Sequence, residues 1–112
     1  MVKPAIRPHS RYSRDAVLLL GQLIRRTRIE RKLTAQGLAE RAGLSRGLVQ
    51  RIEKGDPRCA IGAVFEAAAI VGVRLFDADQ ATLESSVAAN KAMLTLLPKA
   101  VRAARMEVKD DF

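Results

Sequence analysis

The fold is decided by the stretch Thr34-Ala-Gln-Gly-Leu-Ala-Glu-Arg-Ala-Gly-Leu-Ser-Arg-Gly-Leu-Val-Gln-Arg-Ile-Glu-Lys-Gly55. Thr34 and Ser45 each precede a short run of apolar residues at helical spacing. A hydroxyl at such a position can accept from the free amides of a helix's first turn. Gly43 lies between the two runs and can adopt the left-handed conformation that ends a helix. The stretch therefore predicts two short helices joined by a glycine turn.

Apolar residues at helical spacing continue on both sides of this stretch and predict three further helices. In the first, which starts at Arg14, they are Val17, Leu20, Leu23 or Ile24, and Thr27. In the helix after Asp56-Pro57 they are Ile61, Val64, Phe65, Ala68 and Val71. In the last, over residues 80–97, they are Leu83, Val87, Leu94 and Leu97. Pro98 ends this last helix, and residues 73–76 are a candidate short strand because Val, Leu and Phe favour one. The expected fold class is all-α with five helices.

Charge is distributed unevenly along the 112 residues, whose formal net charge is +8. Residues 1–54 hold 13 Lys and Arg against 4 Asp and Glu, whereas residues 55–112 hold 7 against 8. A cationic half of this kind favours a polyanionic partner. With four aromatic residues and no Trp, the chain is poorly equipped to stack on single-stranded bases. Duplex DNA is therefore the expected polyanion.

Several other classes of function lack the residues that they need. The single cysteine, Cys59, allows no internal disulfide, so we expect a cytoplasmic protein. His9 has no second His or Cys at ligand spacing, so no metal site is expected. Asp77 and Asp79 lack a His partner or a glycine loop for phosphate, so we expect no enzyme and no cofactor. The longest apolar run, residues 16–21, is too short to span a membrane.

The second short helix exposes donors that suit the edges of DNA bases. An Arg can bridge guanine O6 and N7, and a Gln can do the same with adenine N6 and N7. Arg46, Gln50 and Arg51 carry these groups near the start of a helix, which is the part of a helix that enters the major groove. Thr34 and Ser45, at two helix N-termini, suit phosphate oxygens.

In these positions the sequence resembles the Cro/repressor-like, xenobiotic-response-element type helix-turn-helix regulators of bacteria and phages. The family's 20-residue unit, started at Ala35, requires the residue types found at Ala39, Gly43, Val49 and Ile52. The resemblance covers residues 20–76 and implies a lambda-repressor-like helix-turn-helix domain. It also implies an ion pair between Arg28 and Glu53.

The resemblance further implies the roles of individual residues. It implies base contacts by Ser45, Arg46 and Arg51, with Gln50 beside them. We expect phosphate contacts by Thr34, Gln36 and Lys54. The sequence departs from the family at two positions. Gly47 lacks a side chain at a base-reading position, and Ala35 replaces the usual Gln, for which Gln36 substitutes imperfectly.

The C-terminal half contains the helix end Leu96-Leu97-Pro98-Lys99, the basic residues Arg102 and Arg105, and an acidic-aromatic end. Together with residues 73–76, these features resemble, more weakly, the HipB-type antitoxins encoded beside HipA-type kinases. That resemblance implies a strand paired across a dimer and a C-terminal part that contacts a kinase toxin. The chain then divides into a flexible basic arm (1–13), the DNA-binding domain (14–78), a C-terminal helix for dimer or partner contact (79–98) and a tail (99–112). The candidate dimer or partner contacts are Leu75, Phe76, Leu83, Val87, Leu94 and Leu97. Helical spacing alone leaves core, dimer and partner roles open for the stripe on the last helix.

The resulting hypothesis is a homodimeric, sequence-specific repressor that binds an inverted repeat in duplex DNA without a membrane partner. Its finer form is an autorepressing antitoxin that neutralises a HipA-like kinase toxin. Two alternatives remain: a stand-alone repressor, and a protein-interaction adaptor that has lost DNA binding.

Overall fold

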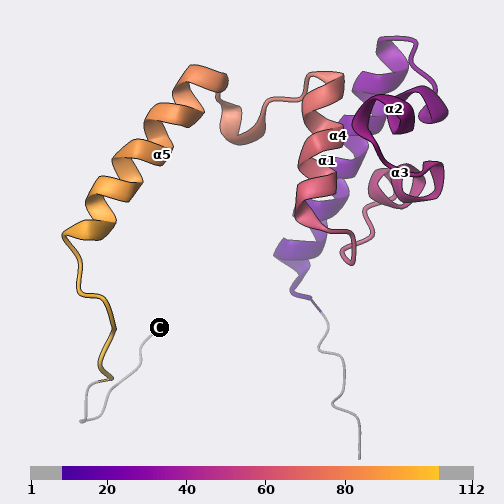
Figure 1. Ribbon diagram of the computed structural model, residues 1–112. Coiled ribbons are helices and arrows are strands. Elements are labelled where there is room, and N and C mark those ends of the chain that lie inside the picture. The colour runs from indigo at the N-terminus through magenta and orange to yellow at the C-terminus, as the bar shows by residue number, and fades with distance from the viewer. Residues whose placement is uncertain (1–8, 104–112) are drawn as a thin grey trace, which may run out of the picture. The chain divides into compact units, whose positions relative to one another are not determined.

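The computed structural model describes residues 9–103, which form five α-helices and one short 3-10 helix (Figure 1). In chain order the elements are α1 (Arg11–Glu30), α2 (Ala35–Ala42), α3 (Arg46–Glu53), α4 (Ile61–Val71), η1 (Leu75–Asp77) and α5 (Gln80–Thr95). The chain divides after Asp77 into two compact units, so that α1 to η1 belong to the first and α5 to the second. The prediction of an all-α fold with five helices is confirmed.

The turn between α2 and α3 forms as its sequence predicts. The hydroxyl oxygen of Thr34 accepts from the backbone N–H of Gly37 at 2.9 Å, and that of Ser45 accepts from the N–H of Leu48 at 3.1 Å. Gly43 ends α2 in the left-handed conformation, with φ 69° and ψ 33°. These caps satisfy amides that a helix leaves free at its start. They therefore fix where α3 begins.

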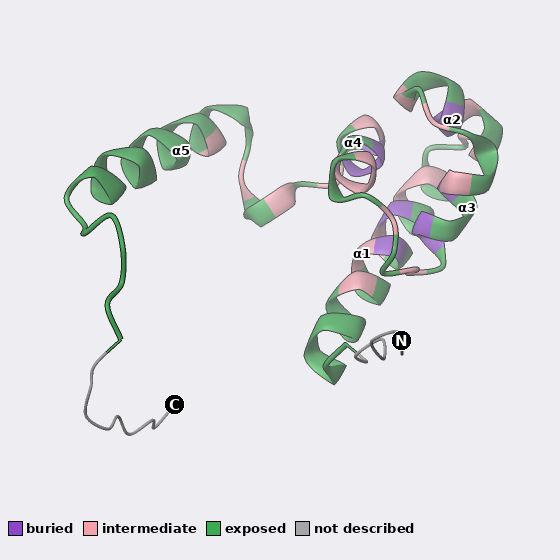
Figure 2. Cartoon of the chain, turned by 60° about the horizontal axis from the view of Figure 1, so that its bottom comes forward, coloured by how far each residue is buried: buried purple, intermediate pink, exposed green. Residues whose placement is uncertain are grey.

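The core of the first unit lies where α1, α2, α3 and α4 face one another. Its buried apolar side chains are Ile24, Leu38, Ala39, Val49, Ile52, Ala67, Ala68 and Val71. Figure 2 shows buried positions on all four of these helices. Small residues on α4 allow close packing, since Ala67 and Ala68 are fully buried. Ile61, expected in the α4 stripe, is instead 69% exposed because it occupies the first position of the helix.

Helix α1 begins three residues before the expected start, at Arg11. Ser10 caps it, because its hydroxyl oxygen accepts from the N–H of Ser13 at 3.1 Å. The composition of residues 1–13 predicts an arm, but the capping serine places residues 11–13 in the helix. The rest of the predicted arm, residues 1–8, lies outside the described residues, as do residues 104–112 of the tail.

The predicted strand over residues 73–76 is wrong, and residues 9–103 contain no strand. The 3-10 helix η1 follows α4 instead, and Phe76 and Asp77 have positive φ angles of 57° and 51°. A strand requires a hydrogen-bonded neighbour, whereas this segment bends so that Leu75 packs against the core. The Phe76 ring lies edge-on to Phe65, with the ring centres 6.4 Å apart and the planes at 85°.

Helix α5 begins at the predicted residue and ends at Thr95, two residues before the prediction. Asp79 caps its start by accepting from the N–H of Thr82 at 2.8 Å. Its end is set by Pro98, because the residue before a proline is disfavoured in the helical region. No helix in the described part of the chain combines the length and apolar content that a membrane span requires.

Candidate nucleic-acid interface

Helix α3 has one buried face and one exposed face. At about 100° per residue, Arg46, Gly47, Gln50 and Arg51 fall within an arc of about 140°, and all four are exposed. The opposite face carries Leu48, Val49, Ile52 and Glu53, which are half-buried or buried. The donors selected from the sequence therefore share one solvent-facing surface.

The exposed donors of α3 are not engaged by their neighbours. Within residues 9–103, no side-chain hydrogen bond and no ion pair involves Arg46, Gln50 or Arg51. Two guanidinium groups and an amide are thus available to an external ligand.

A buried ion pair anchors α3 to α1. Arg28 donates from Nε to Oε2 of Glu53 at 2.7 Å and from Nη2 to Oε1 at 2.9 Å. The Arg28 and Glu53 side chains are only 11% and 6% exposed. Nη1 of Arg28 also donates to the carbonyl oxygen of Leu33 at 2.9 Å. The hydrogen bonds that Arg28 donates to the Glu53 carboxylate raise the pKa of Arg28, against the opposing effect of partial burial. One side chain therefore ties together α1, the segment before α2, and α3.

Gly21 is a positioning residue that the sequence analysis missed. It is buried in α1 where that helix crosses the end of α3. A β-carbon on Gly21 would overlap the carbonyl oxygen of Ile52 and lie 3.1 Å from that of Glu53. Because both contacts are with backbone atoms, no side-chain movement relieves them. The only signal in the sequence is a glycine on the apolar side of a helix that otherwise lacks one.

The three candidate phosphate-binding residues differ in their surroundings. Thr34 uses its hydroxyl oxygen as a cap acceptor, which leaves its O–H able to donate. The side-chain amide of Gln36 donates to Oε2 of Glu40 at 3.1 Å. Lys54 is the exposed C-cap residue of α3 and borders a pocket of about 470 Å³ together with Gln50. Cationic and amide groups from α1, α3 and the C-cap of α3 thus lie around one hollow, which neither Thr34 nor Gln36 lines.

Comparison with known protein families matches residues 19–83 to a family described as a helix-turn-helix domain. The match covers more than half of the chain and includes α2, α3 and the turn between them. The chain belongs to the helix-turn-helix domain family. This assignment makes it a DNA-binding protein of the regulator class, a class that is typically non-enzymatic. No curated protein and no solved structure matches the sequence.

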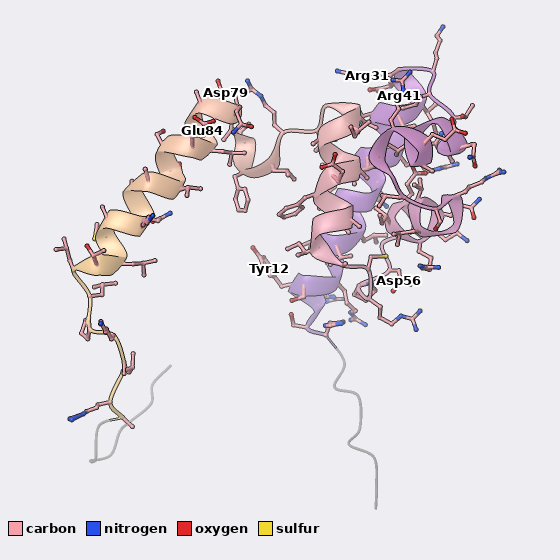
Figure 3. The ribbon with its side chains drawn as sticks, viewed as in Figure 1. Tyr12, Arg31, Arg41, Asp56, Asp79 and Glu84 are labelled. Carbon is pink, nitrogen blue, oxygen red and sulfur yellow. The ribbon has the colours of Figure 1, made fainter. Side chains whose placement is uncertain are left out.

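A second polar hollow of this helix-turn-helix protein lies beside Arg51. The pocket has a volume of about 370 Å³ and is lined by Arg51, Asp56 and Arg58. Figure 3 shows Asp56 in the loop that follows α3. Its carboxylate accepts from Nε of Arg58 at 3.1 Å and from the Arg58 backbone N–H at 2.9 Å. These bonds hold the pKa of Asp56 below its usual range. The carboxylate therefore stays charged in the pocket that Arg51 also lines, and the sequence analysis did not consider this acidic neighbour.

The candidate dimer or partner residues of the helix-turn-helix protein fall into two groups. Leu75 and Leu83 are half-buried, and Leu75 packs against the core of the first unit. The others are exposed, at 80% for Phe76, 67% for Val87, 66% for Leu94 and 52% for Leu97. In the described part of the chain, no group of three His, Cys, Asp or Glu side chains is placed to hold a metal ion.

Proposed function

We propose that this helix-turn-helix protein is a sequence-specific repressor that reads duplex DNA with the exposed face of α3. The single observation that carries the proposal is the arrangement of Arg46, Gln50 and Arg51 on one exposed face of a capped helix, with their donors unused by neighbours in residues 9–103. Bidentate contacts from Arg to guanine and from Gln to adenine give each of these side chains a base-specific partner.

Rigid placement of α3 supports base-specific recognition over simple charge attraction. Specific hydrogen bonds to base edges require a helix whose position is fixed relative to the DNA backbone. The Arg28–Glu53 pair fixes the end of α3, Ser45 fixes its start, and Gly21 sets its distance from α1. A helix held only by apolar packing has fewer constraints on its rotation.

A twofold homodimer on an inverted repeat is part of the proposal. One eight-residue helix reads only a few base pairs, and a second copy doubles the surface that is read. The exposed apolar side chains Val87, Leu94 and Leu97 on and just after α5 support a self-association surface, because water contact of such groups is unfavourable. The simplest regulatory output is repression by occupation of a promoter.

The antitoxin role is a finer hypothesis that rests on the resemblance of the C-terminal half. It predicts that the protein co-purifies with a HipA-like kinase encoded next to it and lowers that kinase's activity. A stand-alone repressor predicts neither effect. An adaptor that has lost DNA binding predicts a protein partner without sequence-specific DNA binding.

The proposal is tested by fluorescence anisotropy with two duplexes at two salt concentrations. One duplex carries the DNA upstream of the protein's own gene, and the other carries the same bases in scrambled order. We expect the upstream duplex to bind roughly a thousandfold or more tightly than the scrambled one. Equal binding to both duplexes that collapses with salt would show that only charge is used, and would overturn the proposal.

A further inference from the structure

Beside α3 lies a pocket whose chemistry favours an anion. Its volume is about 470 Å³, and it is lined by Arg25, Arg28, Ala35, Gln50, Glu53 and Lys54. These residues come from α1, α2 and α3, and from the C-cap of α3. Three of them are cations and one is an anion, so the pocket has a formal charge of +2. Ala35 contributes only a methyl group at the first position of α2, which leaves the space unfilled.

The charges in this pocket are not all equally available. The two carboxylate oxygens of Glu53 already accept from Arg28 at 2.7 Å and 2.9 Å. Three of the five N–H groups of Arg28 are therefore engaged, since Nη1 donates to the Leu33 carbonyl oxygen. Its side chain is also only 11% exposed, so little of it can reach an external ligand. Arg25 differs, because its Nε lies 3.9 Å from Oε1 of Glu53, beyond hydrogen-bond distance. Its side chain is 63% exposed. Arg25 thus keeps its donors free for a ligand.

From this arrangement we infer that the pocket holds a phosphate of the DNA backbone and that Arg25 is its principal ligand. The inference rests on the proposed function. It gives Arg25 a role in DNA binding, although Arg25 lies on α1 and outside the base-reading face of α3. A guanidinium can donate two parallel hydrogen bonds to phosphate oxygens. Gln50 borders the same pocket. A phosphate bound there therefore lies next to a base-reading side chain.

The test compares Arg25→Ala with Arg26→Ala. The two arginines are adjacent in α1, and their side chains are 63% and 68% exposed. Arg26 does not line this pocket, and its Nε lies 3.8 Å from the Glu30 carboxylate, one turn along α1. Both substitutions remove one positive charge, so a difference between them reports the contact and not the net charge.

The readout is the dependence of DNA affinity on salt, measured with the full chain. Losing one phosphate contact lowers the slope of log K against log salt concentration by about 0.9 for each protomer bound. At 0.1 M salt the same loss weakens binding roughly five- to tenfold per contact. We expect this change for Arg25→Ala, to the same extent on the upstream and the scrambled duplex, because phosphate contacts carry no sequence information. Arg26→Ala is expected to keep the wild-type slope.

A second variant tests the pocket itself. Ala35→Glu places a carboxylate at the first position of α2, where a negative charge favours the helix. We expect its melting temperature to equal or exceed that of the wild type while its DNA affinity falls on both duplexes. Lower affinity without unfolding separates an effect on the pocket from an effect on the fold.

A duplex with single methylphosphonate replacements identifies the phosphate. At one position per half-site, the neutral linkage is expected to lower the DNA affinity of the wild type. The DNA affinity of Arg25→Ala is expected to stay the same there, because that variant has already lost the contact. Equal slopes for Arg25→Ala and Arg26→Ala, or no such position, would overturn the inference while leaving sequence-specific DNA binding intact. Calorimetric binding of inorganic phosphate below millimolar concentration, lost in Arg25→Ala, would instead assign the pocket to a free phosphate ligand. A wild type that binds no DNA would overturn the proposed function as well.

Discussion

Breaking the Arg28–Glu53 pair from one side is predicted to destabilise the first unit more than any other single charge removal. Arg28→Met keeps the apolar stem and removes the guanidinium. The Glu53 carboxylate, 6% exposed, then retains only Arg25 at 3.9 Å. Removing one partner of a buried pair leaves an uncompensated charge and costs about 3–5 kcal/mol. Small domains have a total unfolding free energy of about 5–15 kcal/mol, so this loss is a large fraction of it.

The assay is urea unfolding followed by circular dichroism at 222 nm, with the variants Arg28→Met, Glu53→Met and the double variant. In the double variant no charge is left buried, and we expect it to lose less stability than either single variant. Its remaining deficit is about 1 kcal/mol, for the lost hydrogen bond to the Leu33 carbonyl. By thermal melting, each single variant is expected to unfold at least about 12 °C below the wild type.

Arg26→Met is the control, because it removes an exposed charge whose partner Glu30 is 3.8 Å away and 67% exposed. A pair of this kind contributes about 0.5 kcal/mol or less. A loss below about 1 kcal/mol in Arg28→Met, or a double variant that loses the sum of the two single losses, would show that the pair is not a buried charge pair of this kind.

Four further predictions concern packing, capping and phosphate contact. Gly21→Ala is expected to lose at least about 1–3 kcal/mol in urea unfolding, because its methyl group meets backbone oxygens of α3; a loss below 0.5 kcal/mol, on the order of a surface change, would contradict this. Gly47→Ala is expected to gain up to about 1 kcal/mol in the same assay, because open space surrounds that position. The hydrogen bond from the Thr82 N–H lowers the pKa of Asp79. The ionised Asp79 cap therefore stabilises α5 above the ordinary carboxyl pKa, and this stabilisation is lost as the pH falls through the lowered pKa. Circular dichroism should show a loss of helix on acidification that is smaller in Asp79→Asn. Lys54→Ala is expected to lower the affinity for the upstream and the scrambled duplex equally in anisotropy titrations, and to reduce the slope of log K against log salt concentration. A loss of affinity confined to the upstream duplex would refute the phosphate role.

Local signals determined the part of the fold that could be predicted from the sequence. Thr34, Gly43 and Ser45 act through bonds within three or four residues, so the turn between α2 and α3 follows from their identities. Ser10 caps α1 in the same way, but the prolines and basic residues around it favour an arm. The sequence therefore predicts a start of α1 three residues too late.

Features that depend on distant contacts were harder to predict. Residues 73–76 have strand propensity, but β-propensity depends on a neighbouring strand, and burial of Leu75 requires a bend instead. The importance of Gly21 arises from the approach of α3 backbone that is more than 30 residues away in sequence. The Arg28–Glu53 pair, also distant in sequence, was predicted only because a family resemblance supplied it.

Reading of base sequence by the exposed face of α3 is tested by one titration. The affinities of wild type and Arg51→Ala for the upstream duplex and its scrambled counterpart are measured side by side by anisotropy. Losing one bidentate contact removes about 1–3 kcal/mol of discrimination, or about 5- to 150-fold. We predict that the wild type prefers the upstream duplex roughly a thousandfold or more. In Arg51→Ala this preference falls by about 5- to 150-fold, whereas the affinity for the scrambled duplex falls only by the effect of one lost charge. A wild type without preference, or an Arg51→Ala protein with undiminished preference, would contradict the claim.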